Sequence, residues 1–239
     1  MILIFLICDF PESDIRMGNK FELLLLIFLT SLFWSHPAQC QKQKEKSLLQ
    51  LGVSANAYRG DLNSQFKKWT GTFHAGLLFA KKKRLNGSFQ LAVGSVTGQT
   101  ADRDYPGDPD KTPNTYFKTR IIGINYELHY NIIKNEKVTW YVGQGFGILH
   151  YNPRDEYGED LRDQNATRAE GESYGSITIF LPTKMGAIYF LSNEFGLGLE
   201  AGIYNTMTDY LDNVSQWGTK SGNDNMLYFR FFLNIPISI

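Results

Sequence analysis

Eight stretches of alternating apolar and polar residues run along this chain, and the connections between them are alternately short and long. In the last stretch, for example, Leu227, Phe229 and Phe231 alternate with Tyr228 and Arg230. Such alternation places apolar side chains on one face of a β-strand and polar ones on the other. Each stretch has about the length that a tilted strand needs to cross a bilayer. A soluble β-sandwich would alternate in the same way, so the pattern alone leaves both folds open.

The eight predicted strands share this alternation and are separated by turn-forming residues. They are expected at residues 48–58, 70–80, 88–97, 117–132, 138–151, 176–190, 195–206 and 226–237. The connections at 81–87, 133–137 and 191–194 are short, whereas those at 59–69, 98–116, 152–175 and 207–225 are long. An even number of strands with this loop asymmetry is typical of outer-membrane barrels, which have short periplasmic turns and long surface loops. The sequence therefore predicts an all-β fold, an eight-stranded antiparallel transmembrane up-and-down β-barrel.

The N-terminal residues are typical of a bacterial export signal. Residues 17–40 contain a basic residue, an apolar run and a cleavage site with Ala38 and Cys40 at positions −3 and −1. Cleavage there would leave residues 41–239 as one outer-membrane barrel domain, and residues 1–16 are interpreted as a start-site extension. Two alternatives stay open. One is a lipoprotein with lipidated Cys40, and the other is an uncleaved anchor, for which the apolar run is short.

Cysteine content and charge exclude several classes of function. Both cysteines, Cys8 and Cys40, lie in the part that cleavage would remove, so we expect no disulfide, thiolate metal site or cysteine nucleophile in the mature chain. Lysine and arginine together number 24, as do aspartate and glutamate, and this balance gives no reason to expect a nucleic-acid partner. We expect the protein in the cell outer membrane, exported through the cleaved signal peptide.

Strand parity assigns a set of charged residues to the inner face of the barrel. These residues are Glu127, His129, Lys184, Glu200 and Arg230. An eight-stranded barrel has an interior just wide enough for side chains to fill it, and buried charges must pair or lose several kcal/mol of hydration each. Two acids and two bases match a structural ion-pair plug, which we favour over a catalytic group. The same geometry disfavours a diffusion porin.

Two further features follow from parity. Gln144 falls on the outer face among Val142 and Phe146, and a local β-bulge would explain this polar exception. Glycines on the inner face, such as Gly186 and Gly198, are expected to make room for the long charged side chains.

Other motifs that carry chemistry elsewhere fail a test of spacing or context. An aspartate-rich stretch at residues 102–110 suggests calcium, but Pro113 occupies the twelfth position, where an EF-hand loop needs an acid. The three histidines of residues 41–239 lie on separate predicted strands, which argues against a zinc site. His150 faces outward near the rim without a neighbouring serine, so a lipid-hydrolase Ser–His pair has weak support. We therefore assign no catalytic residue, metal site or cofactor.

Basic residues gather at one of the predicted short turns, which contains Lys81, Lys82, Lys83 and Arg84. The long connection at 152–175 is instead rich in aspartate and glutamate. We expect the basic turn to face the periplasm, beside the anionic lipid of the inner leaflet, and to be a candidate docking surface. Simple solvation of a charged turn is the alternative explanation.

Two segments resemble the motifs of a known family. The first contains Tyr58, Gly60, Asp61 and Leu62, and the second contains Thr208, Asp209, Tyr210, Asp212 and Asn213. They resemble the Tyr-x-Gly-Asp-Leu and Thr-Asp-Tyr-Leu-Asp-Asp-Val-Ser segments of a family of small outer-membrane β-barrels from Bacteroidota, with Asn213 in place of the second aspartate of the last pair. The resemblance implies that the second segment lies at the extracellular rim, as a loop-folding motif or a ligand site.

This family is similar to the barrel component of the type IX secretion and gliding apparatus, which associates with a periplasmic ring of a lipoprotein and its partner. The resemblance implies a non-enzymatic docking or scaffolding role. The partners would be outer-membrane lipid, the ring lipoprotein and other secretion components. Two alternatives stay open: a barrel-embedded enzyme that modifies lipid A or phospholipid, and a narrow channel or small-ligand binder.

Overall fold

The computed structural model describes residues 47–62, 66–79, 84–99, 115–164, 174–192, 194–215 and 222–237. All of them belong to one unit of the chain, Lys44–Ile239. The predicted signal peptide and start-site extension lie outside the described residues. No helix in the described residues is long and apolar enough to cross a membrane.

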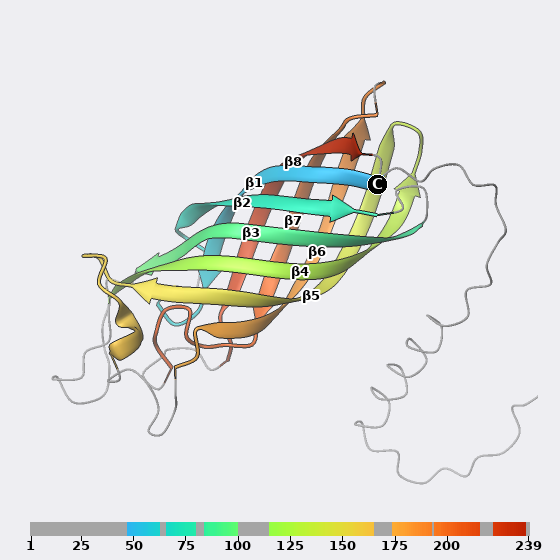
Figure 1. Cartoon of the computed structure of the whole chain (residues 1–239). Coiled ribbons are helices and arrows are strands. Elements are labelled where there is room, and N and C mark those ends of the chain that lie inside the picture. The colour runs from blue at the N-terminus through green and yellow to red at the C-terminus, as the bar shows by residue number, and fades with distance from the viewer. Residues whose placement is uncertain are drawn as a thin grey trace, which may run out of the picture. The chain divides into compact units, whose positions relative to one another are not determined.

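The described residues form eight strands and one short 3₁₀ helix. These are β1 (Ser47–Arg59), β2 (Trp69–Leu78), β3 (Leu85–Gln99), β4 (Tyr116–Lys134), β5 (Val138–Arg154), η1 (Leu161–Asp163), β6 (Ile177–Phe190), β7 (Gly196–Thr206) and β8 (Asn225–Ile237). Each strand pairs antiparallel with its neighbours in sequence, and β1 also pairs with β8, which closes the barrel (Figure 1). The predicted eight-stranded antiparallel barrel is confirmed.

The strand boundaries differ from the predicted ones by at most three residues. The largest differences arise where a long neighbour continues the ladder. β3 begins at Leu85, which pairs with Tyr130 of β4, and β5 continues to Arg154, which pairs with Lys118. β4, with 19 residues, therefore extends both of its partners beyond the stretch that alternates clearly in sequence.

Burial alternates along the strands as parity predicts. On β4, Ile122, Ile124 and Tyr126 are exposed, whereas Asn125 and Glu127 are buried. One set of side chains therefore fills the barrel interior and the other covers its outer surface.

The expected bulge at Gln144 is wrong. Gln144 pairs in regular register with Leu128 on β4 and with Thr183 on β6. The ladder shifts instead between Asn131 and Ile133, close to the turn that joins β4 to β5. A bulge adds one residue to a strand, and here Ile132 and Ile133 are consecutive outward side chains, both exposed.

Gln144 supplies a hydrogen-bond donor where the backbone lacks one. In the register of β5 with β6, Gly145 falls opposite Pro182, which has no N–H to donate. Gln144 Nε2 donates to the Gly145 carbonyl oxygen (3.3 Å), and Thr183 Oγ1 donates to Gln144 Oε1 (2.8 Å). Gln144 is therefore polar on the outer face because its side chain replaces a hydrogen bond that Pro182 cannot supply to the β5–β6 ladder.

The interior is layered along the barrel axis. At the end with the short connections, hereafter the short-turn end, an apolar cluster contains Leu48, Leu78, Tyr141, Ile188 and Phe232. At the opposite end, hereafter the long-loop end, a larger apolar cluster contains Tyr58, Leu62, Val96, Phe117, Ile121, Leu149, Tyr151, Leu161, Phe180, Tyr204, Leu211, Val214, Met226 and Tyr228. Charged and polar side chains lie between the two clusters.

Two inward glycines leave space for aromatic rings. A Cβ atom at Gly198 would overlap the ring of Phe232, and one at Gly186 would lie 2.6 Å from the hydroxyl oxygen of Tyr141. The expectation that these glycines accommodate the charged side chains is therefore wrong for both positions. The rings need the space because aromatic side chains are the widest groups that a barrel of this size encloses.

Candidate functional site

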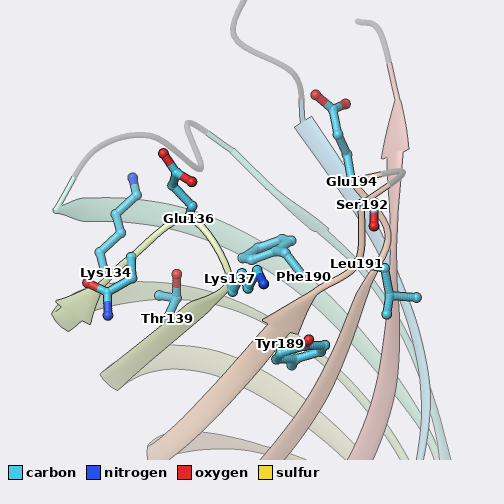
Figure 2. A pocket seen from close by; sticks show the side chains of 10 residues that line it. Lys134, Glu136, Lys137, Thr139, Tyr189, Phe190, Leu191, Ser192 and Glu194 are labelled. Carbon is cyan, nitrogen blue, oxygen red and sulfur yellow. The ribbon is translucent and has the colours of Figure 1, made fainter.

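A cavity of about 1000 Å³ opens at the short-turn end (Figure 2). Its lining comes from the turn between β4 and β5 and the turn between β6 and β7. It carries both signs of charge, with Lys134 and Lys137 on one side and Glu136 and Glu194 nearby. In Figure 2 the ring of Phe190 lies between the two turns. This cavity is a candidate contact surface at the short-turn end.

The basic turn expected to dock partners is described only at its last residue. Arg84 is exposed, and its carbonyl oxygen accepts a hydrogen bond from the backbone N–H of Asn131 (2.8 Å). Lys81, Lys82 and Lys83 lie outside the described residues. The bond to Asn131 joins the end of this turn to β4, beside the β4–β5 turn that lines the cavity.

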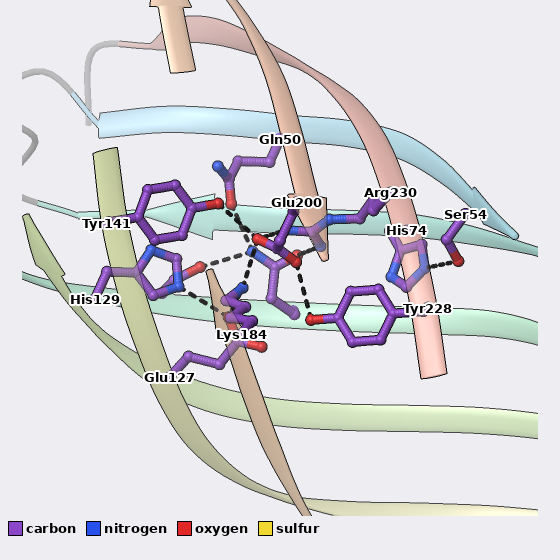
Figure 3. A network of polar contacts seen from close by, with 12 residues as sticks. Gln50, Ser54, His74, Glu127, His129, Tyr141, Lys184, Glu200, Tyr228 and Arg230 are labelled. Atoms are coloured by element: carbon purple, nitrogen blue, oxygen red, sulfur yellow. Dashed lines mark hydrogen bonds and ion pairs between the residues drawn. The ribbon is translucent and has the colours of Figure 1, made fainter. Parts of the chain in front are cut away.

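The five charged residues assigned to the interior form one connected network (Figure 3). Lys184 Nζ lies 3.0 Å from Glu200 Oε2 and also contacts Glu127 Oε2. Arg230 Nη2 lies 2.8 Å from the same Glu200 oxygen, and His129 Nε2 lies 2.9 Å from Glu127 Oε2. Their side chains are at most 3% exposed. The structure thus brings together, in the middle of the barrel, residues from four strands.

Neutral groups complete the hydrogen bonding of both carboxylates. Tyr141 and Tyr228 donate their hydroxyl hydrogens to Glu200 Oε2 (2.6 Å) and Oε1 (3.0 Å), respectively. Asn125 Nδ2 donates to Glu127 Oε1 (2.7 Å). Every carboxylate oxygen of the network therefore has a partner, as a stable buried charge requires. Sequence reasoning missed Tyr141, although its inward parity on β5 was visible.

A chain of amides extends the network across the barrel. Arg230 Nη1 donates to Gln90 Oε1 (3.1 Å), Gln90 Nε2 donates to Gln50 Oε1 (2.6 Å), and Gln50 Nε2 donates to Asn234 Oδ1 (2.8 Å). These bonds join β8, β3 and β1 through the interior. Gln90 was not singled out in the sequence, although it too has inward parity.

The interior also contains a serine–histidine contact, but its hydrogen bonds run in the wrong direction for nucleophile activation. Ser54 Oγ lies 2.8 Å from His74 Nε2 and donates its hydrogen to Asn56 Oδ1 (2.7 Å). His74 must then donate to the serine oxygen, whereas a general base would accept from it. Both side chains are buried between the two apolar clusters. The contact therefore fits a structural role.

Neither of the other candidate chemistries finds support in the described residues. Among them, no group of three or more histidine, cysteine, aspartate or glutamate side chains is placed to hold a metal ion. The aspartate-rich stretch at 102–110 lies outside the described residues. His150 is exposed on the outer face, paired with Ile122 and Ile177 on the two neighbouring strands.

The long-loop end holds a second buried polar cluster, which brings together the two segments that carry the resemblance. Tyr58 Oη lies 2.6 Å from Asp212 Oδ2 and 2.7 Å from Asp224 Oδ1. All three residues are fully buried. Gly60 lies against this cluster, since a Cβ atom there would overlap both the Tyr58 hydroxyl and the Asp224 carboxyl group. Sequence reasoning missed Asp224, which directly precedes β8.

The two carboxyl groups hold the backbone of both motif segments. Asp212 accepts from the N–H groups of Leu62 (Oδ2, 3.2 Å) and Val214 (Oδ1, 2.9 Å), and Asp224 Oδ2 accepts from that of Leu211 (2.9 Å). The side chains of these three apolar residues lie in the cluster at the long-loop end. The motif segments therefore fold into the barrel opening instead of only bordering it.

The remaining motif residues shape the same segment. Thr208 Oγ1 accepts from the Tyr210 backbone N–H (3.2 Å) and lies 3.1 Å from Tyr151 Oη. Asn213 has a φ of 65°, a left-handed conformation that asparagine adopts more readily than most residues. Its Nδ2 donates to the carbonyl oxygen of Gln164 (3.3 Å), next to η1.

Burial controls the ionisation of both carboxyl groups. Burial raises the pKa of Asp212 to about 7. The negative charge of Asp61 also raises this pKa, whereas the hydrogen bond from Tyr58 lowers it. Burial also raises the pKa of Asp224 well above its usual value, and the charges of Asp212 and Asp209 act in the same direction. These shifts follow from two carboxyl groups that share one apolar site.

Comparisons with known proteins bear on the fold alone. The sequence matches no protein-family model and no curated protein. Ail, the attachment invasion locus protein of Yersinia pestis, is 11% identical with a TM-score of 0.48, over 82% of this chain and 100% of that chain. Neisserial surface protein A is 12% identical with a TM-score of 0.48, over 80% and 97%. The outer membrane enzyme PagL is 15% identical with a TM-score of 0.35, over 79% and 99%. Likeness at this level supports no inference about activity.

Proposed function

We propose that this chain is an integral outer-membrane β-barrel that acts as a non-enzymatic structural component and docks partners at its short-turn end. A belt of exposed apolar side chains on the strands supports membrane insertion. Ile124 is 60% exposed and Leu199 is 65% exposed, and similar residues occur on every strand. Water disfavours so large an apolar surface, whereas lipid stabilises it.

The non-enzymatic role rests on one observation, the closed interior. Glu127, Lys184, Glu200 and Arg230 are ion-paired with one another between two apolar clusters, so a substrate would have to displace buried ion pairs to reach them. The equal numbers of acids and bases leave no net charge to attract one. The groups that could perform chemistry are thus engaged in holding the strands together.

Docking at the short-turn end is supported by charge and by shape. The cavity there presents charged side chains around the aromatic rings of Tyr189 and Phe190; these charged residues are Lys134, Lys137, Glu136 and Glu194. The basic turn that ends at Arg84 lies on the neighbouring hairpin. Mixed charges around an apolar centre suit a protein partner. Short turns face the periplasm in barrels of this topology. The family resemblance makes a periplasmic ring lipoprotein of type IX secretion the partner to test first.

The test is an affinity capture from cross-linked outer membranes. We expect the wild-type protein to recover a periplasmic lipoprotein identified by mass spectrometry. The variant Lys134→Glu/Lys137→Glu should recover at least fivefold less, because the new glutamates would repel the acidic groups of the partner that the lysines attract. Lys118→Glu, an exposed lysine at the long-loop end, is the matched control and should recover the wild-type amount. Each variant is first shown to be folded by its heat-dependent migration in electrophoresis. Equal recovery by all three folded proteins would refute docking at this cavity.

A further inference from the structure

The contacts of Tyr58 require one more hydrogen than the tyrosine carries. Its hydroxyl oxygen lies 2.6 Å from Asp212 Oδ2 and 2.7 Å from Asp224 Oδ1, and both are hydrogen-bond distances. A phenol has a single O–H and can donate to only one of the two oxygens. The second contact must therefore contain a hydrogen on the carboxyl group, which donates to the phenol oxygen.

The other contacts of the two carboxyl groups show which of them holds this hydrogen. Asp212 Oδ2, the oxygen nearest Tyr58, also accepts from the Leu62 N–H, and Oδ1 accepts from the Val214 N–H. Both oxygens of Asp212 thus act as acceptors. Among the described residues, the hydrogen-bond partner of Asp224 Oδ1 is Tyr58, while Oδ2 accepts from a backbone N–H. Asp224 is therefore the acid, and Asp212 is the acceptor of the Tyr58 hydrogen.

We propose that the proton shared by Asp212, Asp224 and Tyr58 is a pH-sensitive lock that holds residues 207–215, hereafter the cap segment, in the opening of the barrel. The cap segment inserts Leu211 and Val214, both fully buried, into the apolar cluster at the long-loop end. This switch lies at the opposite end from the docking cavity and goes beyond the proposed docking function.

Loss of the proton would weaken the contacts through which Tyr58 and Asp224 hold the cap segment. The proton leaves Asp224 for solvent, and its carboxylate then faces the Tyr58 oxygen with no hydrogen between them. Among the described residues, the other charged groups that raise the pKa values of this pair are Asp61, after β1, and Asp209, within the cap segment, and both are acidic. A second carboxylate in the cluster therefore adds repulsion from several directions.

The sign of the pH dependence follows from the raised pKa values. Burial raises the pKa of both carboxyl groups above the usual value of 3.8, so the pair binds its shared proton more tightly when the cap is closed than when it is open. Closure is then most stable below the usual value and weakens as the pH rises toward the raised pKa of the pair. The opening equilibrium should increase roughly tenfold per pH unit between these limits and level off above them.

The test is hydrogen exchange on the full barrel refolded in detergent micelles, between pH 5 and pH 8.5. Protection factors, corrected for the intrinsic pH dependence of exchange, are measured for peptides that cover 207–215. We expect them to fall at least tenfold between pH 5 and pH 8.5, whereas those of Val138–Arg154 stay constant. Equal protection of the cap segment at the two pH values would overturn the proposal.

Two variants separate a proton lock from general loosening. Asp224→Asn mimics the protonated acid, because its amide can donate to Tyr58 and still accept from Leu211, so the cap should stay protected at all pH values. Asp160→Asn, on the partly exposed N-cap of η1, should keep the wild-type pH dependence. Tyr58→Phe removes the bridge and should reduce protection already at pH 5. A wild-type pH dependence in Asp224→Asn, or full protection in Tyr58→Phe, would contradict the lock.

Discussion

At the scale of single residues, Gly60 is the position where one added methyl group should have the clearest effect. A Cβ atom there would overlap the Tyr58 hydroxyl and the Asp224 carboxyl group. Gly60→Ala should therefore separate two buried polar groups and lower the free energy of unfolding by about 1–3 kcal/mol. Urea unfolding in micelles, followed by tryptophan fluorescence, measures this. Gly71→Ala on β2 is the control, since nothing lies within 4 Å of its added Cβ. Equal urea midpoints for Gly60→Ala and the wild-type protein would contradict the packing described for Gly60.

Residue identities in the interior could be predicted where they depend only on strand parity. Glu127 and Lys184 were assigned inward because the period of a strand is two whatever its partners are. Asp224 could not be found this way, since its role depends on Tyr58, which lies 166 positions away in the sequence. The prediction of a bulge at Gln144 was wrong for a similar reason, because the role of this side chain depends on Pro182 in the next strand. Contacts between strands decide such roles, and a single sequence does not display them.

At the scale of elements, the buried ion pairs link strands that are not all neighbours. Lys184 of β6 joins Glu127 of β4 to Glu200 of β7. Lys184→Met would leave one carboxylate without its cation and should lower the free energy of unfolding by about 3–5 kcal/mol. The double variant Lys184→Met/Glu127→Gln restores the charge balance and should recover at least half of that loss. Lys118→Met, at an exposed lysine, should have little effect.

The outcome that would contradict this view of the network is additivity. If Glu127→Gln alone and Lys184→Met alone each cost stability and the double variant loses the sum of the two, then the residues do not act as a pair. Unfolding of the four proteins is compared in one detergent at one pH, so that insertion into the micelle and ionisation are held constant.

Elements differ in how well the sequence predicts them. Strands were predictable to within three residues because alternation is a local pattern. The long connections were expected to be surface loops, yet Leu62, Leu161 and Leu211 are buried in the barrel opening. Their burial site is built by rings such as Phe117 and Tyr151 from distant strands. An isolated leucine in a polar connection carries no local sign of such a site, so the sequence could not reveal the inserted loops.

At the scale of the whole molecule, the barrel is closed at three levels. The cap segment and the cluster at the long-loop end form the first, the ion-pair network the second, and the cluster at the short-turn end the third. Only the first depends on the proton held by Asp224. Opening of the cap segment at high pH should therefore expose the interior at the long-loop end without making a continuous water path through the barrel.

This separation predicts the electrical behaviour of the protein. Purified barrel reconstituted in planar bilayers should produce no stepwise current at 100 mV, at pH 5 or at pH 8.5, because the network of Lys184, Glu200 and Arg230 fills the middle of the barrel and apolar side chains fill the short-turn end. Heat-dependent migration of the same preparation shows that folded barrel was inserted. Steps at both pH values would mean that the interior is not closed. Steps only at pH 8.5 would mean that the cap segment is the sole barrier and that the two deeper layers do not block ions.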